Sequence, residues 1–453
     1  MQRQLTTGSV SNQLIKLTLP MIWGVFAIVA FNLVDTYFVG KLGTDELAAM
    51  SFTFPVVTVL GSIAIGLGIG ASSVIARAIG EGDRAKVKAL TTNSLTLSIL
   101  IVGVFVAIGL TTMKPLFLLL GASDRILTLV IQYMTVWYLG MIFLVIPMVG
   151  NSAIRAAGNT LTPSIIMTVA AVVNIILDPI LIFGWGAIPG LELRGAALAT
   201  VIARATTLVA SLWVLHFRQQ MLLCRIPKLS QAWGCWKEIL YVGLPAAGTN
   251  TINPISIGFI TSLMASYGAE RVAGFGIASR IESFAVIALM ALSASIGPFV
   301  GQNWGAEKYV RVKQALRLSF MFCFIWGVLA AIILGFTAPQ LATIFNRNLE
   351  VIATASLYLR LVPISYAAYG IILVSSSTFN ALGKPIPSVI MTMARMLILY
   401  VPLAYLGSKL FGVIGIFSAA CLANLVVGIS AYIWNQRTCN SPDENKVKVS
   451  VGN

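Results

Sequence analysis

The sequence predicts an all-α integral membrane protein, with twelve transmembrane helices in two parallel-repeat bundles of six. Three observations support this fold class. Hydrophobic residues make up 58% of the 453-residue chain and charged residues only 10%, whereas an average soluble domain has roughly 25% charged residues. Apolar stretches of about 20 residues, long enough for a helix to cross a hydrocarbon core of about 30 Å, follow one another. The second half of the chain also repeats the first.

The apolar stretches define the predicted helices in chain order. They lack the roughly ten-residue alternation of polar and apolar positions that a transmembrane barrel requires. The polar N-terminus has no signal sequence, so we expect the first helix to be retained. The twelve helices are placed at 14–40, 50–77, 90–113, 126–150, 162–185, 195–217, 237–266, 274–300, 316–338, 351–379, 387–408 and 412–435.

The net charge of +15 follows this topology. If the N-terminus is cytoplasmic, the inside loops contain the basic runs 77–88, 217–228 and 307–317, and the outside loops contain isolated charges. Because basic residues concentrate in cytoplasmic loops, we expect a multi-pass protein of the bacterial inner membrane with both termini in the cytoplasm. Nucleic-acid binding would need a basic domain outside the lipid bilayer, and the sequence has none.

The two halves match at an offset of 225 positions, from Pro20 to Pro245. Each half has an even number of helices, so the second half enters the membrane from the same side and the repeat is parallel. The predicted domains are an N-lobe (1–216), a cytoplasmic linker (217–236), a C-lobe (237–436) and a disordered cytoplasmic tail (437–453).

A parallel repeat favours a transporter that binds its substrate between the halves and exposes it to each side in turn. The TVGYG-like filter of a channel and the G-x-x-x-x-G-K-[ST] loop of an ATP-driven pump are both missing. No catalytic constellation is visible, and the single histidine, His216, excludes a His-rich metal centre. We therefore expect no enzyme and no cofactor, and transport driven by an ion gradient.

Apart from Glu238 in the first turn of the seventh predicted helix, three acidic residues fall inside predicted helices: Asp35, Asp178 and Glu282. A charged Asp at a helix centre costs roughly 2.5–3.5 kcal/mol on insertion scales, so each acid needs a partner, water or a proton. Asn174 precedes Asp178 by one turn, on the same helix face, and can present an amide beside its carboxylate.

Asn32 and Thr36 flank Asp35 as further polar groups. The repeat distinguishes a functional role from a structural one. Asp35 matches Ile260 at the offset of 225, and Asp178 matches Val401 when Asp178-Pro179 is aligned with Val401-Pro402. If the acids only held the fold together, both halves would carry polar residues at these positions. Their restriction to the first half favours a functional role. The alternative is a pair of neutral, hydrogen-bonded structural acids.

Other charged residues within the predicted helices are weaker evidence for a transport role. Glu282 has Arg280 two positions away, which favours a local or interfacial ion pair. Arg204, Arg360 and Arg395 also lie in predicted helices, and we assign them no transport role, because arginines often snorkel to helix ends.

Pro20 breaks the hydrogen-bond ladder of the first helix and can bend it, which would change the exposure of Asp35. A fixed kink that serves packing is the alternative.

The chain resembles the multidrug and toxic compound extrusion (MATE) family over nearly its whole length. Leu19-Pro20 and the segments 32–49, 153–164, 174–184 and 379–388 carry the resemblance. It implies an antiporter that exports drugs while protons or sodium ions enter.

Within the family, the chain is similar to the DinF-like branch. That similarity implies an ion-coupling site at Asp35, Asn174 and Asp178, with Tyr133 and Asn151 as polar neighbours. The NorM-like branch carries acids in its seventh and tenth helices. Here the seventh has no acid beyond Glu238 in its first turn, and the tenth has none, so a C-lobe sodium site is not expected.

The mechanism we expect couples export to protonation. Burial disfavours the charged form of a carboxyl group, so Asp35 or Asp178 would exchange a proton near neutral pH. Protonation from outside would favour a rearranged first helix and drug release, and deprotonation toward the cytoplasm would restore drug binding. A sodium ion at the same two residues is the alternative coupling ion.

We expect drug-like cationic or amphiphilic substrates and a monomeric protein. The candidate substrate contacts are Phe31, Tyr37, Tyr133 and Met167. The alternative function is a lipid-linked oligosaccharide flippase of the same superfamily. Such a flippase would need Lys and Arg in both lobes, whereas this chain has acids in one.

Overall fold

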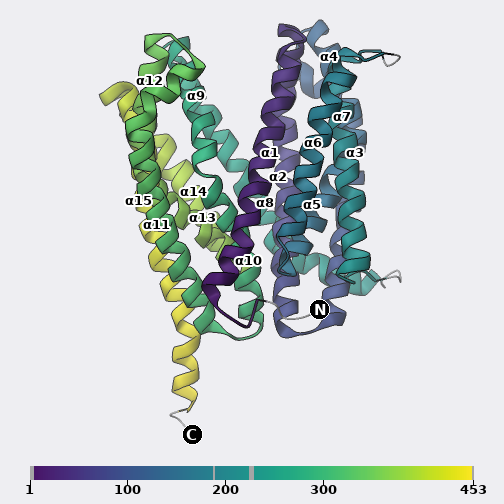
Figure 1. The fold of residues 1–453 in the computed structure, drawn as a ribbon, viewed down its shortest axis with the longest axis vertical. Helices are drawn as coiled ribbons and strands as arrows, with labels where there is room; N and C mark the ends of the chain where they lie inside the picture. The colour runs from purple at the N-terminus through teal and green to yellow at the C-terminus, as the bar shows by residue number, and fades with distance from the viewer. Residues whose placement is uncertain (1–4, 187–188, 224–228, 451–453) are drawn as a thin grey trace. The chain divides into compact units, whose positions relative to one another are not determined.

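The computed structural model describes residues 5–186, 189–223 and 229–450, with Thr44, Leu47 and residues 440–450 described by their backbone alone. The described residues form helices and contain no β-strand (Figure 1). Residues 224–228 of the predicted linker lie outside the described residues. Most of the predicted disordered tail also lies beyond the described side chains and stays a prediction.

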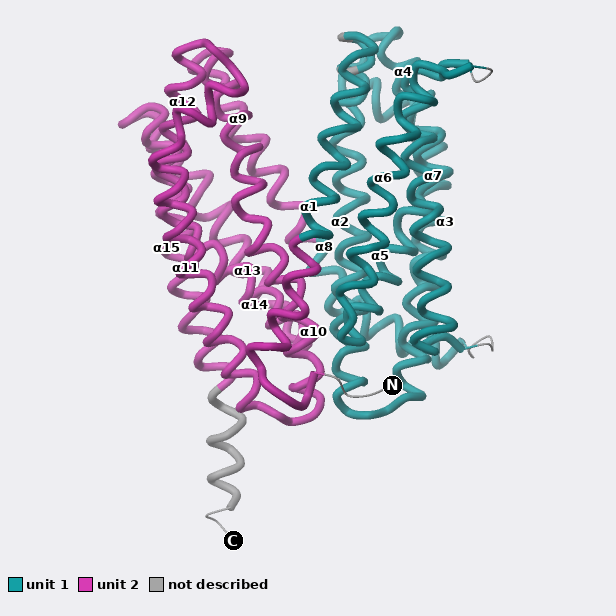
Figure 2. The backbone as a smooth tube through the Cα atoms, in the orientation of Figure 1, with its two compact units in different colours: residues 1–2, 23–247 teal, residues 3–22, 248–453 magenta. Residues whose placement is uncertain are grey.

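The chain forms two compact units (Figure 2). Unit 1 contains Trp23–Ala247, and unit 2 combines the N-terminal residues up to Ile22 with Gly248–Asn453. The helices that lie in unit 1 are the second part of α1 (Val10–Gly40), α2 (Thr44–Glu81), α3 (Arg84–Leu119), α4 (Asp124–Leu139), α5 (Met141–Ala156), α6 (Leu161–Phe183), α7 (Glu192–Trp213) with the π-helix η1 (Val214–Arg218), and the first part of α8 (Leu229–Ala265).

Unit 2 begins with the first part of α1 and continues with the second part of α8. Its other elements are α9 (Ala269–Ala285), α10 (Ile287–Gly305), α11 (Tyr309–Phe345), α12 (Leu349–Leu361), the 3₁₀ turn η2 (Val362–Ser365), α13 (Tyr366–Ala381), α14 (Pro385–Met393), the π-helix η3 (Ala394–Tyr400) and α15 (Val401–Ser450).

These elements correspond to the twelve predicted transmembrane helices. Among the described residues, eight helices are long and apolar enough to cross a membrane, or ten if each of two bent pairs is one span. The pairs are α4 with α5, bent by 45°, and α9 with α10, bent by 46°. The last apolar segment, Pro385–Cys439, holds two spans, because Gly412 has non-helical angles inside α15. The 37-residue α8 is the twelfth span. The predicted all-α membrane fold is confirmed.

Helix boundaries follow from local chemistry. Gly82 ends α2 in the left-handed conformation, with φ 85°, which glycine adopts without steric cost. Asp83 then starts α3 by accepting a hydrogen bond from the Lys86 backbone N–H at 2.9 Å. This turn lies in the basic run 77–88, which is one of the loops predicted to face the cytoplasm.

Glycines bring α2 close to the first part of α8 within unit 1. A Cβ added to Gly70 would lie 2.4 Å from the Ile239 carbonyl oxygen, and one added to Gly66 would lie 2.5 Å from the Gly243 carbonyl oxygen. Membrane helices approach each other closely through such small residues. The close approach explains why the start of α8 belongs to unit 1.

The start of α1 is held in unit 2 by basic residues at the end of α10 and the beginning of α11. Arg311 donates from Nη1 to the Gly8 carbonyl oxygen at 2.7 Å and from Nη2 to Gln13 Oε1 at 3.0 Å. Lys308 Nζ donates to the Thr6 carbonyl oxygen at 2.7 Å. These charge-assisted bonds fix the N-terminal segment against unit 2.

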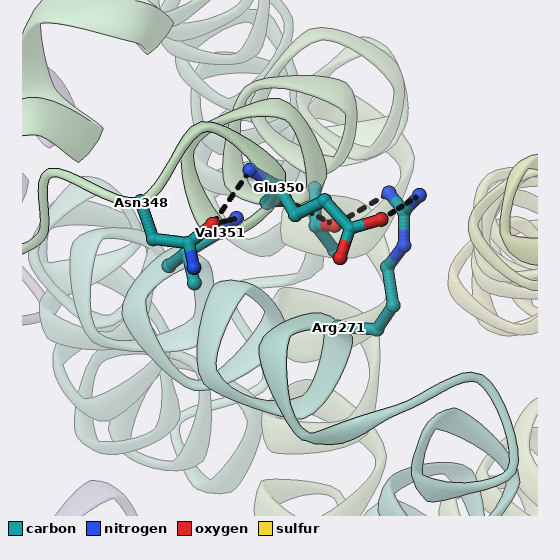
Figure 3. A network of polar contacts seen from close by, with 5 residues as sticks. Arg271, Asn348, Glu350 and Val351 are labelled. Carbon is teal, nitrogen blue, oxygen red and sulfur yellow. Dashed lines mark hydrogen bonds and ion pairs between the residues drawn. The ribbon is translucent and has the colours of Figure 1, made fainter.

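At the other end of unit 2, a polar network joins α9 to α12 (Figure 3). Arg271 donates to Glu350 Oε1 at 3.3 Å and to Thr354 Oγ1 at 2.9 Å. Asn348 caps α12, because its Oδ1 accepts from the Glu350 backbone N–H at 2.8 Å. The network orders one end of unit 2.

Each unit has its own apolar core, with Phe117 and Ile154 fully buried in unit 1 and Phe299 and Tyr366 fully buried in unit 2. Large apolar side chains also cover exposed helix faces, for example Phe336, which is 80% exposed. A water-soluble protein would rarely leave such continuous apolar faces uncovered. A lipid bilayer solvates them, as expected for spanning helices.

Candidate ion-coupling site

The centre of the candidate site is one turn of α6. Asn174 Nδ2 donates to Asp178 Oδ1 at 2.9 Å, and both side chains are 0% exposed. This is the pairing that their four-residue spacing predicts, because residues i and i+4 lie on the same helix face. Asp178 therefore keeps one oxygen bonded and presents the other to neighbouring helices.

Asp35 joins the site from α1. Its side chain is 8% exposed, and it interacts electrostatically with Asp178 of α6 and with Arg204 of α7. The three side chains come from α1 and from the consecutive helices α6 and α7, and all three lie in the same compact unit. Two carboxylates and one guanidinium leave this buried group one negative charge in excess when both acids are ionised.

Arg204 is a site residue that sequence analysis passed over. Its guanidinium lies 5.1 Å from the centre of the Phe31 ring, one turn before Asp35 on α1. The ring and the carboxylate together hold the cation, because an arginine is attracted to the face of an aromatic ring. The available signal was an arginine deep in an apolar helix whose only acid, Glu192, lies 12 residues before it, too far along the helix to pair with it.

Tyr133 of α4 and Asn151 of α5 are also buried, at 6% and 3% exposure. Tyr133 interacts electrostatically with both Asp35 and Asp178. Asn151 is buried in the same unit, and the structure shows no hydrogen bond to its Oδ1 among the described residues. Tyr133 therefore lies beside the acids, whereas the structure shows Asn151 only as a buried residue of the same unit.

The buried oxygens of this group are short of donors. Within the described part of the chain, no hydrogen bond reaches Asp35 Oδ1, Asn174 Oδ1 or Asp178 Oδ2. Buried acceptors are normally satisfied, so a cluster of open oxygens is suited to a proton or to a small cation. No group of three or more His, Cys, Asp or Glu side chains that could hold a metal ion occurs in the described residues.

The periodicity of α1 separates the flanking polar residues from the acids. Phe31, Asp35 and Val39 are buried at 6%, 8% and 0% exposure, because they recur every four residues on one face. Asn32 and Thr36 lie on the exposed side, where Thr36 Oγ1 donates to the Asn32 carbonyl oxygen at 2.8 Å. The structure therefore does not bring these two residues to the carboxylates.

The candidate substrate contacts also differ in how exposed they are. Phe31 is buried beside Arg204 and Met167 is half-buried on α6. Tyr37 is 59% exposed, and its ring lies 4.6 Å from Lys41 Nζ. Pro20 lies inside the continuous helix α1, in the part that belongs to unit 2.

Glu282 of α9 corrects one expectation. It accepts a hydrogen bond from Tyr358 Oη at 2.5 Å and forms no ion pair with Arg280, which is exposed. The local ion pair predicted with Arg280 is wrong, because residues two apart on a helix point in different directions, and Glu282 interacts electrostatically with Arg395 instead. Unit 2 therefore holds a half-buried acid bonded to tyrosine.

Comparisons with known proteins agree with the fold. The MatE family model matches residues 20–180 and 245–406, one match in each half of the chain. A protein of Shewanella oneidensis named "FAD transporter" is 39% identical over 435 residues, which cover 96% of each chain. The multidrug export protein MepA of Staphylococcus saprophyticus is 25% identical, over 94% of this chain and 93% of its own.

Among solved structures, the D35N mutant of the Vibrio cholerae MATE transporter VcmN superposes with a TM-score of 0.90. It is 32% identical, and the match covers 95% of this chain and 97% of that chain. Together with two matches to the family model that span most of the sequence, these similarities establish the family. The chain belongs to the MatE family of multidrug and toxic compound extrusion proteins, and it is a membrane transporter rather than an enzyme.

Proposed function

We propose that the protein is a secondary active antiporter that exports organic compounds as protons enter the cell. The observation that carries the proposal is the group of Asp35, Asp178 and Arg204, with open carboxylate oxygens buried inside unit 1. The DinF-like assignment, the bacterial inner membrane, the cytoplasmic termini and the monomeric state are parts of the same proposal.

Charge balance explains why this group would take up a proton. Arg204 can compensate one carboxylate, and the second then remains uncompensated in a medium of low dielectric constant. Binding one proton or one sodium ion neutralises it. In the described residues, no cation other than Arg204 interacts with the two acids. We therefore favour the coupling ion as the positive charge that balances the second carboxylate.

The driving force is sufficient for useful export. One proton crossing 100 mV contributes about 2.3 kcal/mol, which supports a roughly fifty-fold gradient of a neutral compound. Helix α1 belongs to both compact units, so a change of charge at Asp35 acts on a helix that reaches past Pro20 into unit 2. We propose that this helix carries the switch between the two access states.

Cationic and amphiphilic compounds are the substrates we propose first, because the excess charge of the site is negative. MepA, a relative over most of the chain, is a multidrug export protein. Phe31, Tyr133 and Met167 are the proposed apolar contacts, and Tyr37 would serve only at the exposed end of α1.

FAD is the second candidate substrate. The specific observation in its favour is the 39% identity to the protein named FAD transporter, which covers 96% of each chain. FAD is an anion, so its phosphates would need a basic group away from the carboxylates of unit 1. No comparable observation favours the flippase alternative.

The test uses purified protein in liposomes loaded with a fluorescent cationic dye. Dye release is followed after an outside-acid pH jump and, separately, after a sodium jump. We expect proton-driven release that is lost in Asp35→Asn and Asp178→Asn and retained in Asp124→Asn, an exposed acid that serves as the control. If only the sodium jump drives release, the coupling ion is sodium and not the proton. Unchanged release in both site variants would refute the proposal.

A further inference from the structure

An open groove lies on the surface of unit 1 between α6 and α7, which pack against each other (Figure 1). It has a volume of about 680 Å³. Its lining comes from the first turns of α6 (162–166), from the second half of α7 (202–213) and from η1 (214–218). Because α6 begins there and η1 ends there, the groove lies at the end of two spanning helices, where hydrocarbon meets lipid headgroups.

The walls of the groove are almost entirely apolar. Ile165, Ile202 and Val209 line it with exposed side chains. The two threonines of the lining, Thr162 and Thr206, each have a hydroxyl group that is hydrogen-bonded to a residue three positions earlier. The polar atoms of the walls are therefore already paired, and the groove offers an occupant mainly apolar surface.

One end of the groove carries a positive charge. Arg218 lines it from η1 and is exposed. The Gln219 backbone N–H donates to the Val214 carbonyl oxygen at 2.9 Å, five residues back, so this last turn is one residue wider than an α-helical turn. Val214 and Arg218 both line the groove from this turn. Within the described part of the chain, Arg218 forms no ion pair and no hydrogen bond.

Trp213 indicates how deep this end of the groove lies. Its side chain lines the groove and is exposed. Tryptophan is enriched at the boundary between headgroups and hydrocarbon. Arg218 follows about one turn later, at the start of the basic run 217–228, and basic residues in such a position attract anionic lipids. The groove thus combines apolar walls at the level of acyl chains with a cation at the level of headgroups.

The two parts of the groove select an occupant together. The acyl chains of a bilayer are as apolar as the walls, so the walls alone give no preference for one lipid over another. Arg218 repels a cationic compound, and a small free anion would leave the apolar walls uncovered. A phospholipid with a negatively charged headgroup matches both the walls and the cation.

We propose that the groove between α6 and α7 binds one anionic phospholipid, with an acyl chain along the apolar walls and the phosphate group at Arg218. The inference does not depend on the proposed antiport. It gives a role to η1 and Arg218, which the coupling mechanism does not use. The lipid lies on the two helices that carry Asp178 and Arg204 of the coupling group.

The test measures quenching of Trp213 fluorescence by brominated lipids. Purified full-length protein is placed in vesicles of phosphatidylcholine and phosphatidylglycerol, with bromine on the acyl chains of one lipid at a time. The chain has nine tryptophans, so the Trp213 signal is the difference between each protein and the same protein with Trp213→Phe. We expect phosphatidylglycerol to occupy the site about five-fold more often than its share of the lipid predicts. Arg218→Gln should abolish this preference, and the variant should fold because Arg218 is exposed.

Two further variants separate the groove from a general effect of surface charge. Arg84→Gln removes an exposed arginine of unit 1 that is outside the groove, and it should keep the preference. Ala210→Phe keeps Arg218 but adds a large side chain to the wall of the groove, and it should lose the preference.

The inference is overturned if both lipids quench Trp213 in proportion to their share in the vesicle, because the groove then accepts any lipid. It is also overturned if Arg218→Gln or Ala210→Phe keeps the preference, since the lipid is then not held by the groove and its arginine together. Displacement of brominated phosphatidylglycerol by the cationic dye would assign the groove to exported compounds instead.

Discussion

The two units have the same type of helical scaffold and different buried charges. In unit 1, Asp35 interacts electrostatically with both Asp178 and Arg204. In unit 2, Glu282 accepts a hydrogen bond from Tyr358 and interacts electrostatically with Arg395, which also donates to Asn253. Ile260, which matches Asp35 in the repeat, is an apolar residue at 0% exposure. The fold therefore accepts an apolar side chain at this position, and the difference between the units concerns chemistry rather than architecture.

The largest effect is expected from removing the charge of either aspartate in unit 1. Asp178→Asn and Asp35→Asn should lower proton-driven dye release by about a hundred-fold or more, because each removes a group that exchanges the coupling proton. Ile260→Val, at the matching position of unit 2, should leave release at the wild-type level. Loss of release in Ile260→Val would contradict the functional difference between the two units, since the matching positions of the repeat would then be equally important.

Close glycine contacts should be needed in both units. A Cβ on Gly70 would meet the Ile239 carbonyl oxygen at 2.4 Å, and one on Gly415 in unit 2 would meet the Gly407 carbonyl oxygen at 2.0 Å. Gly70→Ala and Gly415→Ala should each lower the free energy of unfolding by about 1–3 kcal/mol through overpacking. Thermal unfolding in detergent measures this effect.

The control for these variants is Gly61→Ala, because nothing lies within 4 Å of a Cβ added to Gly61. It should be neutral or slightly stabilising, since alanine favours the helix more than glycine does. A destabilised Gly61→Ala would show that the cost comes from helix α2 itself and not from contacts between helices.

Replacing Arg204 should change the pH dependence of transport. A neighbouring cation favours the charged form of a carboxyl group, so Arg204→Gln should let the site bind its proton at higher pH. We expect the half-maximal pH of dye release to rise by about one unit or more, with release still measurable. An unchanged or lowered half-maximal pH would remove Arg204 from the coupling group and leave the charge-balance argument without support.

The smallest effects are expected at the acid of unit 2. Glu282→Gln keeps a side chain that can accept from Tyr358, so proton-driven dye release should change less than about two-fold. Arg280→Gln, two positions away and exposed, should change it even less. A large loss of dye release in Glu282→Gln, with normal folding, would show that unit 2 also contains an acid that takes part in ion coupling.

Much of the fold follows from local pattern. The apolar stretches, the bent pair around Gly140 and the capped turn at Asp83 are all determined by residues close in the chain. Asn174 and Asp178 also pair as their spacing predicts, because one helical turn brings them together. Asn32 and Thr36 show the limit of this reasoning, since neighbours in the sequence lie on different faces of α1.

The sequence by itself determined the number and order of the spanning helices and the presence of acids within them, because bilayer thickness and helix rise set those lengths. Only the tertiary structure decided which charges meet. Arg204 reaches Phe31 and Asp35 from α7, and Arg395 reaches Asn253 and Tyr369 across unit 2. Such partners depend on how distant helices pack, and no spacing along one chain specifies that packing.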